Sequence, residues 1–324
     1  MNTSKVKDMS YAFFNQDEFN DPIECWDTAQ VTNMDRMFKR ASTFNQSIAE
    51  WNTSQVTSMN GMFLRAYSFD KPIGEWDTSL VTTLGDMFRE TLSFNQSIAE
   101  WNTSRVSDMV GMFSLTRFYN QPIGGWNTSQ VTNMASMFYF ARSFNQSINE
   151  WNTSQVTNMS NMFLLASLFN QSVVEWNTSQ LKNMVSMFGF TDFFNQPIGE
   201  WDTSQVRNMN NMFRSSSFNQ SINEWNTSQV RNMNDMFWGA NSFNQFIEEW
   251  NTSQVTNMSG MFAFAGSFQQ PIGKLDTSQV TNMASMFRSS SFNQSIDEWN
   301  TSQVTTMSDM FLGASSFNQC LSTW

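Results

Sequence analysis

Residues 151–163 have the sequence Trp-Asn-Thr-Ser-Gln-Val-Thr-Asn-Met-Ser-Asn-Met-Phe, and close variants of this stretch recur along the whole chain. Each repeat continues through Phe-Asn-Gln-Ser-Ile or a variant of it and, in most copies, ends in Glu. Counted from Trp26, the first position of the unit carries Trp at every later step except Leu275, and Met1 occupies the same position at the start. A fixed period of this length indicates stacked structural units. We therefore predict thirteen coils of about 25 residues.

The middle of each unit is predicted to form a short helix. In one copy the apolar residues are Val156, Met159, Met162, Phe163 and Ala166, and at 100° per residue they fall within an arc of about 120°. The preceding Asn/Asp-Thr-Ser supplies side-chain oxygens that cap helix starts.

A five-residue strand is predicted for Phe-Asn-Gln-Ser-Ile, because Phe144 and Ile148 share one face and Asn145 and Ser147 the other. The expected fold class is an α/β repeat solenoid in which each coil has a short strand plus a short helix. Trp, Val, Met, Phe and Ile at fixed positions should stack in ladders from coil to coil. The abundance of Met and Phe is thus best explained by core packing.

One uninterrupted solenoid domain is expected over residues 1–324, because no linker or shift in composition interrupts the array. Neither end has an evident polar capping unit. We expect either a piece of a longer array or end-to-end docking of one copy on the next, and a contact of this type that does not close builds a filament.

Residues 76–88 (Trp-Asp-Thr-Ser-Leu-Val-Thr-Thr-Leu-Gly-Asp-Met-Phe) and residues 151–163 resemble the repeats of bacterial surface proteins and mycoplasma lipoproteins, the BspA-like branch of the leucine-rich-repeat proteins. The resemblance covers the whole chain. It departs from that family where Phe-Asn-Gln-Ser-Ile replaces Leu-Asp-Leu-Ser. The resemblance implies a leucine-rich-repeat-like solenoid and an extracellular, non-enzymatic role in adhesion or surface structure.

The net charge of -11 and the absence of clustered Lys and Arg argue against a nucleic-acid partner. No stretch has the length and apolarity of a membrane span, and the N-terminal residues lack the apolar core of a secretion signal. The chain has no histidine, which excludes Ser-His-Asp and Cys-His catalysis. Only carboxylate chemistry would remain, and we expect no enzyme and no obligatory cofactor.

Two rows of repeated polar residues are candidate sites. The acidic row lies at the end of the unit and forms a solvated edge or, alternatively, a weak site for Ca²⁺ or Mg²⁺; it comprises Glu50, Glu75, Glu100, Glu150, Glu175, Glu200, Glu224, Glu249 and Glu298. Asn at position 2 lies in Asn-Thr-Ser and serves as a cap or, alternatively, as a glycosylation acceptor; these residues are Asn52, Asn102, Asn127, Asn152, Asn177, Asn226, Asn251 and Asn300. Position 20 repeats the glycosylation pattern as Asn-Gln-Ser.

Cys25 and Cys320 lie in the first and last units, too far apart in a solenoid for an intrachain disulfide. They are either two ordinary thiols or partners of cysteines in another copy or segment. The sequence favours an extracellular structural or adhesive protein that assembles end to end, with other surface proteins or glycans as partners. The alternative is a monomeric surface receptor that binds glycan or protein through polar residues on the concave face of its strands.

Overall fold

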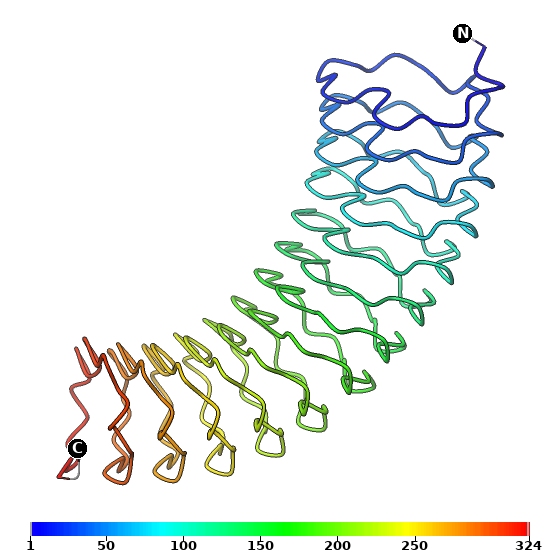
Figure 1. Cartoon of the computed structure of the whole chain (residues 1–324). Coiled ribbons are helices and arrows are strands. Elements are labelled where there is room, and N and C mark those ends of the chain that lie inside the picture. The colour runs from blue at the N-terminus through cyan, green and yellow to red at the C-terminus, as the bar shows by residue number, and fades with distance from the viewer. Residues whose placement is uncertain (1, 323) are drawn as a thin grey trace. The chain divides into compact units, whose positions relative to one another are not determined.

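The computed structural model describes residues 2–322 and 324, in which each sequence unit forms one coil. The coils group into two compact units. The first contains Met1–Val156 and Leu165–Gln171, and the second contains Thr157–Leu164 and Ser172–Trp324. Within each unit, successive coils lie alongside one another in chain order (Figure 1).

The predicted helix and strand are both wrong. Residues 2–322 and 324 contain no α-helix, and their only β-structure is a series of isolated parallel bridges at position 8 of the coil. In the first unit the bridges run from the Asp8–Asn33 pair to the Asp108–Asn133 pair. In the second they continue to the Asn282–Thr306 pair. The α/β description is therefore corrected to a solenoid of turns.

Positions 9–16 form a chain of turns in which two kinds of backbone hydrogen bond alternate. The N–H groups of Met34, Arg36 and Phe38 donate to carbonyls of the following coil at 3.0, 2.9 and 2.9 Å. Between them, the N–H groups of Met37 and Lys39 donate to the residue three positions earlier, at 3.3 and 3.1 Å. The backbone is thus satisfied half by its own turns and half by the next coil, as buried peptide groups require.

A four-residue backbone period explains why the helix prediction fails. Positions 11 and 15 have positive φ, +53° at Arg36 and +62° at Arg40, which no α-helix contains. Positions 9, 12, 13 and 16 nevertheless point inward, as they would in a helix, and the side chains of Met34 and Phe38 are fully buried. The apolar spacing therefore fits both structures, and only the backbone distinguishes them.

An asparagine ladder replaces the predicted strand. Phe144 and Ile148 are buried as expected. However, the N–H of Asn170 donates to the side-chain Oδ1 of Asn145 at 3.0 Å, and Gln171 Nε2 donates to the same oxygen at 3.1 Å. Side-chain amides thus take the place of backbone carbonyls between these coils, which prevents a regular β-ladder.

The predicted core register is confirmed. The ring of Phe88 lies 5.8 Å from the rings of Phe63 and Phe113, with interplanar angles of 4° and 11°. The buried Trp101 donates from Nε1 to the carbonyl of Ile73 at 3.0 Å. Trp, Phe, Met and Ile therefore stack along the axis of each unit, and the polar atom of the indole is satisfied inside the core.

Replacement of Asn145 by Ala should remove the shared acceptor of two donors in the next coil. We expect the free energy of unfolding to fall by about 1 kcal/mol, because two part-buried donors lose their partner. Urea denaturation followed by tryptophan fluorescence measures the change. Ser147→Ala, at an exposed position two residues away, is the control. Equal midpoints for both variants would contradict the ladder.

Candidate functional site

The side chains at positions 11, 14 and 15 of the coils form a surface that we call the turn face. Positions 12 and 13 between them are almost always Met-Phe, whereas positions 14 and 15 change from coil to coil. Examples of these pairs are Lys39-Arg40, Arg89-Glu90, Trp238-Gly239, Ala263-Phe264 and Arg288-Ser289. Most of these side chains lie outside the stacked core, although Ser114 and Ala263 at position 14 are buried.

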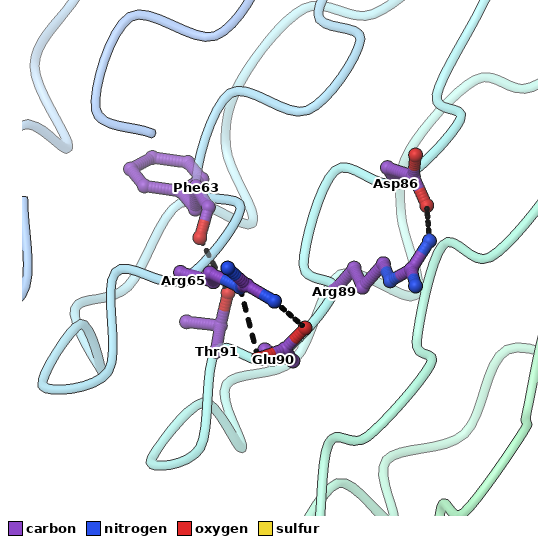
Figure 2. Close-up of polar contacts among 6 residues, drawn as sticks. All are labelled: Phe63, Arg65, Asp86, Arg89, Glu90 and Thr91. Atoms are coloured by element: carbon purple, nitrogen blue, oxygen red, sulfur yellow. Dashed lines mark hydrogen bonds and ion pairs between the residues drawn. The ribbon is translucent and has the colours of Figure 1, made fainter. Parts of the chain in front are cut away.

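Figure 2 shows the turn face of the first unit, where Arg65 meets Glu90 of the next coil. Arg65 donates from Nε to Oε2 and from Nη2 to Oε1, both at 3.0 Å. This bidentate geometry is the strong form of the ion pair, and the hydrogen bonds to Glu90 raise the pKa of Arg65. Beside it, Arg89 donates to Asp86 at 3.3 Å.

A depression of about 220 Å³ lies at this cluster and is lined by Lys39, Arg40, Leu64, Arg65, Arg89 and Glu90. Its lining contains four cationic side chains and one carboxylate. The first unit therefore presents a locally basic surface on a chain whose net charge is -11.

The second unit has a different turn-face cluster, centred on Arg214. Its Nη1 lies 3.2 Å from Oδ2 of Asp235, and its guanidinium carbon lies 4.2 Å from the ring centre of Trp238. Arg214 is thus held by an ion pair and a cation–π contact. Its Nε atom is buried without a hydrogen-bond partner. Burial raises the pKa of Asp235, although the charge of Arg214 opposes the shift.

A larger depression of about 520 Å³ lies next to this cluster. Small residues, Gly260, Ala284 and Ser285, line it together with the larger side chains of Phe264 and Arg288.

Gly260 leaves room for the carboxylate of Asp235. A Cβ there would clash with Oδ1 of Asp235. Arg288 is only loosely paired, with its Nη1 3.7 Å from Oδ2 of Asp309. The site thus combines aromatic rings, a partly available guanidinium and an open hollow.

The sequence-predicted candidates lie elsewhere. The nine glutamates of the acidic row and the eight asparagines at position 2 are all exposed. In the part of the chain that the structure describes, no group of three or more His, Cys, Asp or Glu side chains could hold a metal ion. Cation binding by the acidic row stays a prediction. Cys25 and Cys320 are exposed and free.

The asparagines at position 2 act as caps of turns, not of helices. Oδ1 of Asn52 accepts the N–H of Ser54 at 3.1 Å, and Oδ1 of Asp77 accepts that of Ser79 at 2.9 Å. This Asx-turn explains why Asn and Asp interchange there. Glycosylation of the exposed asparagines stays a prediction.

Sequence reasoning missed the turn face because it searched for residues that repeat. The available signal was the opposite one, a pair of positions that varies inside an otherwise constant unit. For example, Met-Phe is followed by Trp238-Gly239 in the unit that begins at Trp225, and by Arg288-Ser289 in the unit that begins at Leu275.

The fold and the site define a repeat solenoid that presents a variable surface on a constant core. The chain belongs to the family described as Mycoplasma protein of unknown function, DUF285, whose repeat matches residues 1–81, 68–172, 146–245 and 214–324. The resemblance to mycoplasma repeat proteins is therefore confirmed. A comparison with curated proteins gave no match.

Several solved structures show weak similarity. A leucine-rich repeat protein from Bacteroides ovatus is 8% identical, with 91% of this chain and 78% of the other covered, at a TM-score of 0.36. A further match is the TLR13–ssRNA13 complex, which is 11% identical, with 89% of this chain and 48% of the other covered, at a TM-score of 0.21. Another is the plant peptide hormone receptor RGFR1 in complex with RGF2, which is 6% identical, with 86% of this chain and 58% of the other covered, at a TM-score of 0.20. This chain thus spans about half the length of these two receptors. TM-scores this low establish no common fold in detail.

Gly260→Ala tests the packing of the second cluster. Non-glycine residues occur with positive φ at the same position of other coils, as at Asp235 and Ser285, so the main cost is the contact with the carboxylate of Asp235. We expect a loss of about 1 to 3 kcal/mol in unfolding free energy, as for other overpacked sites. Chemical denaturation measures it.

Gly125→Ala is the matched control, because a Cβ at Gly125 meets no atom within 4 Å. The double variant Asp235→Ala/Gly260→Ala should recover part of the loss. If the double variant is as unstable as the sum of the single variants, the proposed contact is wrong.

Proposed function

We propose that the chain is a non-enzymatic recognition protein of the cell surface that adheres to a partner through the turn face. The observation that carries this proposal is the concentration of variable Arg and aromatic residues around the hollow at Gly260. Repeat proteins commonly keep a constant core and use a repeated outer surface for binding. Positions 14 and 15 contribute little to the stack, so their side chains are free to be selected for binding.

The residue types at the hollow suit a protein partner. Arg and Trp are enriched among the residues that dominate binding energy at protein interfaces. Phe264 is 37% exposed, and the side chain of Arg288 is 41% exposed. Both can be covered by a partner without disturbing the buried Phe ladder. A partner with a carboxylate near an apolar group would match the guanidinium and the ring together.

Other features agree with a surface role without catalysis. The chain has no histidine, and its family includes Mycoplasma repeat proteins of unknown function. In residues 2–322 and 324, no helix is long and apolar enough to cross a membrane. We propose an extracellular location on the basis of the repeat type.

The double variant Phe264→Ser/Arg288→Ser tests this function. Serine occurs at position 15 of other coils, as at Ser215 and Ser289, and at position 14 as Ser114, so the turns should tolerate both changes. We expect binding to immobilised extracellular-matrix proteins, measured by surface plasmon resonance, to weaken at least about tenfold, as for loss of two central interface residues.

The matched control, Arg117→Ser/Phe118→Ser, removes one arginine and one exposed phenylalanine outside the turn face. It should bind like the wild type. Equal loss in both variants, or no binding by the wild type to any matrix protein, would contradict a recognition role for the turn face.

End-to-end assembly into filaments is a second proposal. It is favoured by the uniform contact between coils, in which N–H groups of one coil meet carbonyls of the next at the same positions. A coil of another copy could use the same pairing. Electron microscopy over a range of concentrations would show uniform fibres. Particles that stay dispersed at the highest concentration would contradict the proposal and leave the turn-face proposal standing.

The glycan-receptor alternative loses part of its basis. It relied on free polar side chains along the predicted strand, but Oδ1 of Asn145 already accepts two hydrogen bonds from the next coil. In that coil Asn145 and Gln146 are half-buried, and Ser147 at position 22 is exposed.

A further inference from the structure

Three cations occupy position 7 of successive coils in the second unit: Lys182, Arg207 and Arg231. The other coils carry Thr or Ser at this position, apart from Lys7 in the first coil. All three cationic residues are exposed. We call this row the basic stripe.

The backbone places the basic stripe in register. The N–H of Arg207 donates to the carbonyl of Lys182 at 3.2 Å, and the N–H of Arg231 donates to that of Arg207 at 3.0 Å. At the adjacent position 8, parallel bridges join Asn183 to Asn208 and Asn208 to Asn232. The three side chains therefore leave neighbouring coils about 4.8 Å apart on the same side, as in a parallel ladder.

The stripe replaces a stabilising interaction with a repulsive one. In other coils the Thr hydroxyl at position 7 donates to the carbonyl of the preceding coil, as from Thr57 to Thr32 at 3.1 Å and from Thr281 to Thr256 at 3.1 Å. Lys and Arg side chains lack this hydroxyl. Like charges on neighbouring strands repel as well.

No carboxylate compensates for this change. Among the described residues, none forms an ion pair with Lys182, Arg207 or Arg231, although the chain carries an excess of acidic groups. Three uncompensated charges in consecutive coils therefore have no explanation in the stability of the fold.

We propose that the basic stripe binds a linear acidic polysaccharide that carries one carboxylate on each sugar. A sugar ring is about as long as the step from coil to coil. Successive carboxylates of such a polymer project in different directions, and the long, flexible side chains of Lys and Arg can reach around the chain to meet them. Duplex DNA fits less well, because phosphates on one strand rise by about 3.4 Å. The net charge of -11 also disfavours so dense a polyanion. This site is separate from the turn face and does not depend on its function.

The triple variant Lys182→Thr/Arg207→Thr/Arg231→Thr tests the proposal, because it restores the residue found in the other coils. The probe is polygalacturonate, with neutral dextran and single-stranded DNA as comparison polymers, in affinity electrophoresis at low and physiological salt. We expect the wild type to bind polygalacturonate, and the triple variant to bind at least about tenfold more weakly, since three charge contacts are lost.

The control variant Lys71→Gln/Arg105→Gln/Arg117→Ser removes three positive charges elsewhere, and two of its changes restore the common Gln of their positions. It should retain polygalacturonate binding. Thermal melting is the second readout, and the triple-threonine variant should melt no lower than the wild type.

Four results would overturn the proposal. They are an absence of polygalacturonate binding by the wild type, equal binding by the wild type and the triple-threonine variant, equal loss in the control variant, and binding of single-stranded DNA in preference to polygalacturonate. A triple-threonine variant that melts below the wild type would contradict the premise that the cations lack a structural purpose.

Discussion

Each coil depends on the next for its backbone hydrogen bonds. In a helix the peptide groups are satisfied within the element, but here alternate N–H groups at positions 9–15 have their acceptors one coil away. Side chains extend the same dependence, because Thr103 donates to the carbonyl of Asn127 and Trp101 to that of Ile73. A single coil would leave these groups unpaired, so a coil is stable only within a stack. This dependence explains why the repeat length of the sequence is nearly constant, because every coil must present donors and acceptors at the same places.

The turn chain also determines which positions are free to vary. Positive φ at positions 11 and 15 turns those side chains away from the stacked Met and Phe residues. The chain tolerates Arg, Asp, Glu, Phe, Ser and Leu there in the left-handed conformation, although this backbone is costly for a non-glycine residue. In each turn, this conformational cost is offset by contacts that do not involve the side chain at position 11 or 15. The side chains at positions 11 and 15 can therefore be selected for what they bind, and the pair of Arg65 with Glu90, both at position 15, becomes possible without loss of the core.

Much of this arrangement could be predicted from the sequence. The period, the register and the buried ladders, such as Phe88 between Phe63 and Phe113, follow from repetition and hydrophobicity. The local backbone could not be predicted, because an inward pattern of positions 9, 12, 13 and 16 fits a helix and a chain of turns equally well. Asn145 was assigned to the outer face of a strand because its role as an acceptor for the next coil is invisible without the stack. The turn face was missed because the prediction searched for repeated residues, while its signal is variation.

The same reasoning separates two kinds of surface position in this fold. At position 7 the usual threonine contributes a hydrogen bond to its neighbour, so a change to Lys or Arg has a structural cost. At positions 14 and 15 the side chain contributes little to the stack, so variation costs little. A departure from the common residue is therefore stronger evidence of function at position 7 than at position 14. Three adjacent coils lose this hydrogen bond, and all three carry a positive charge in its place, at Lys182, Arg207 and Arg231. Binding of an external anion explains this common change better than the stability of the fold does.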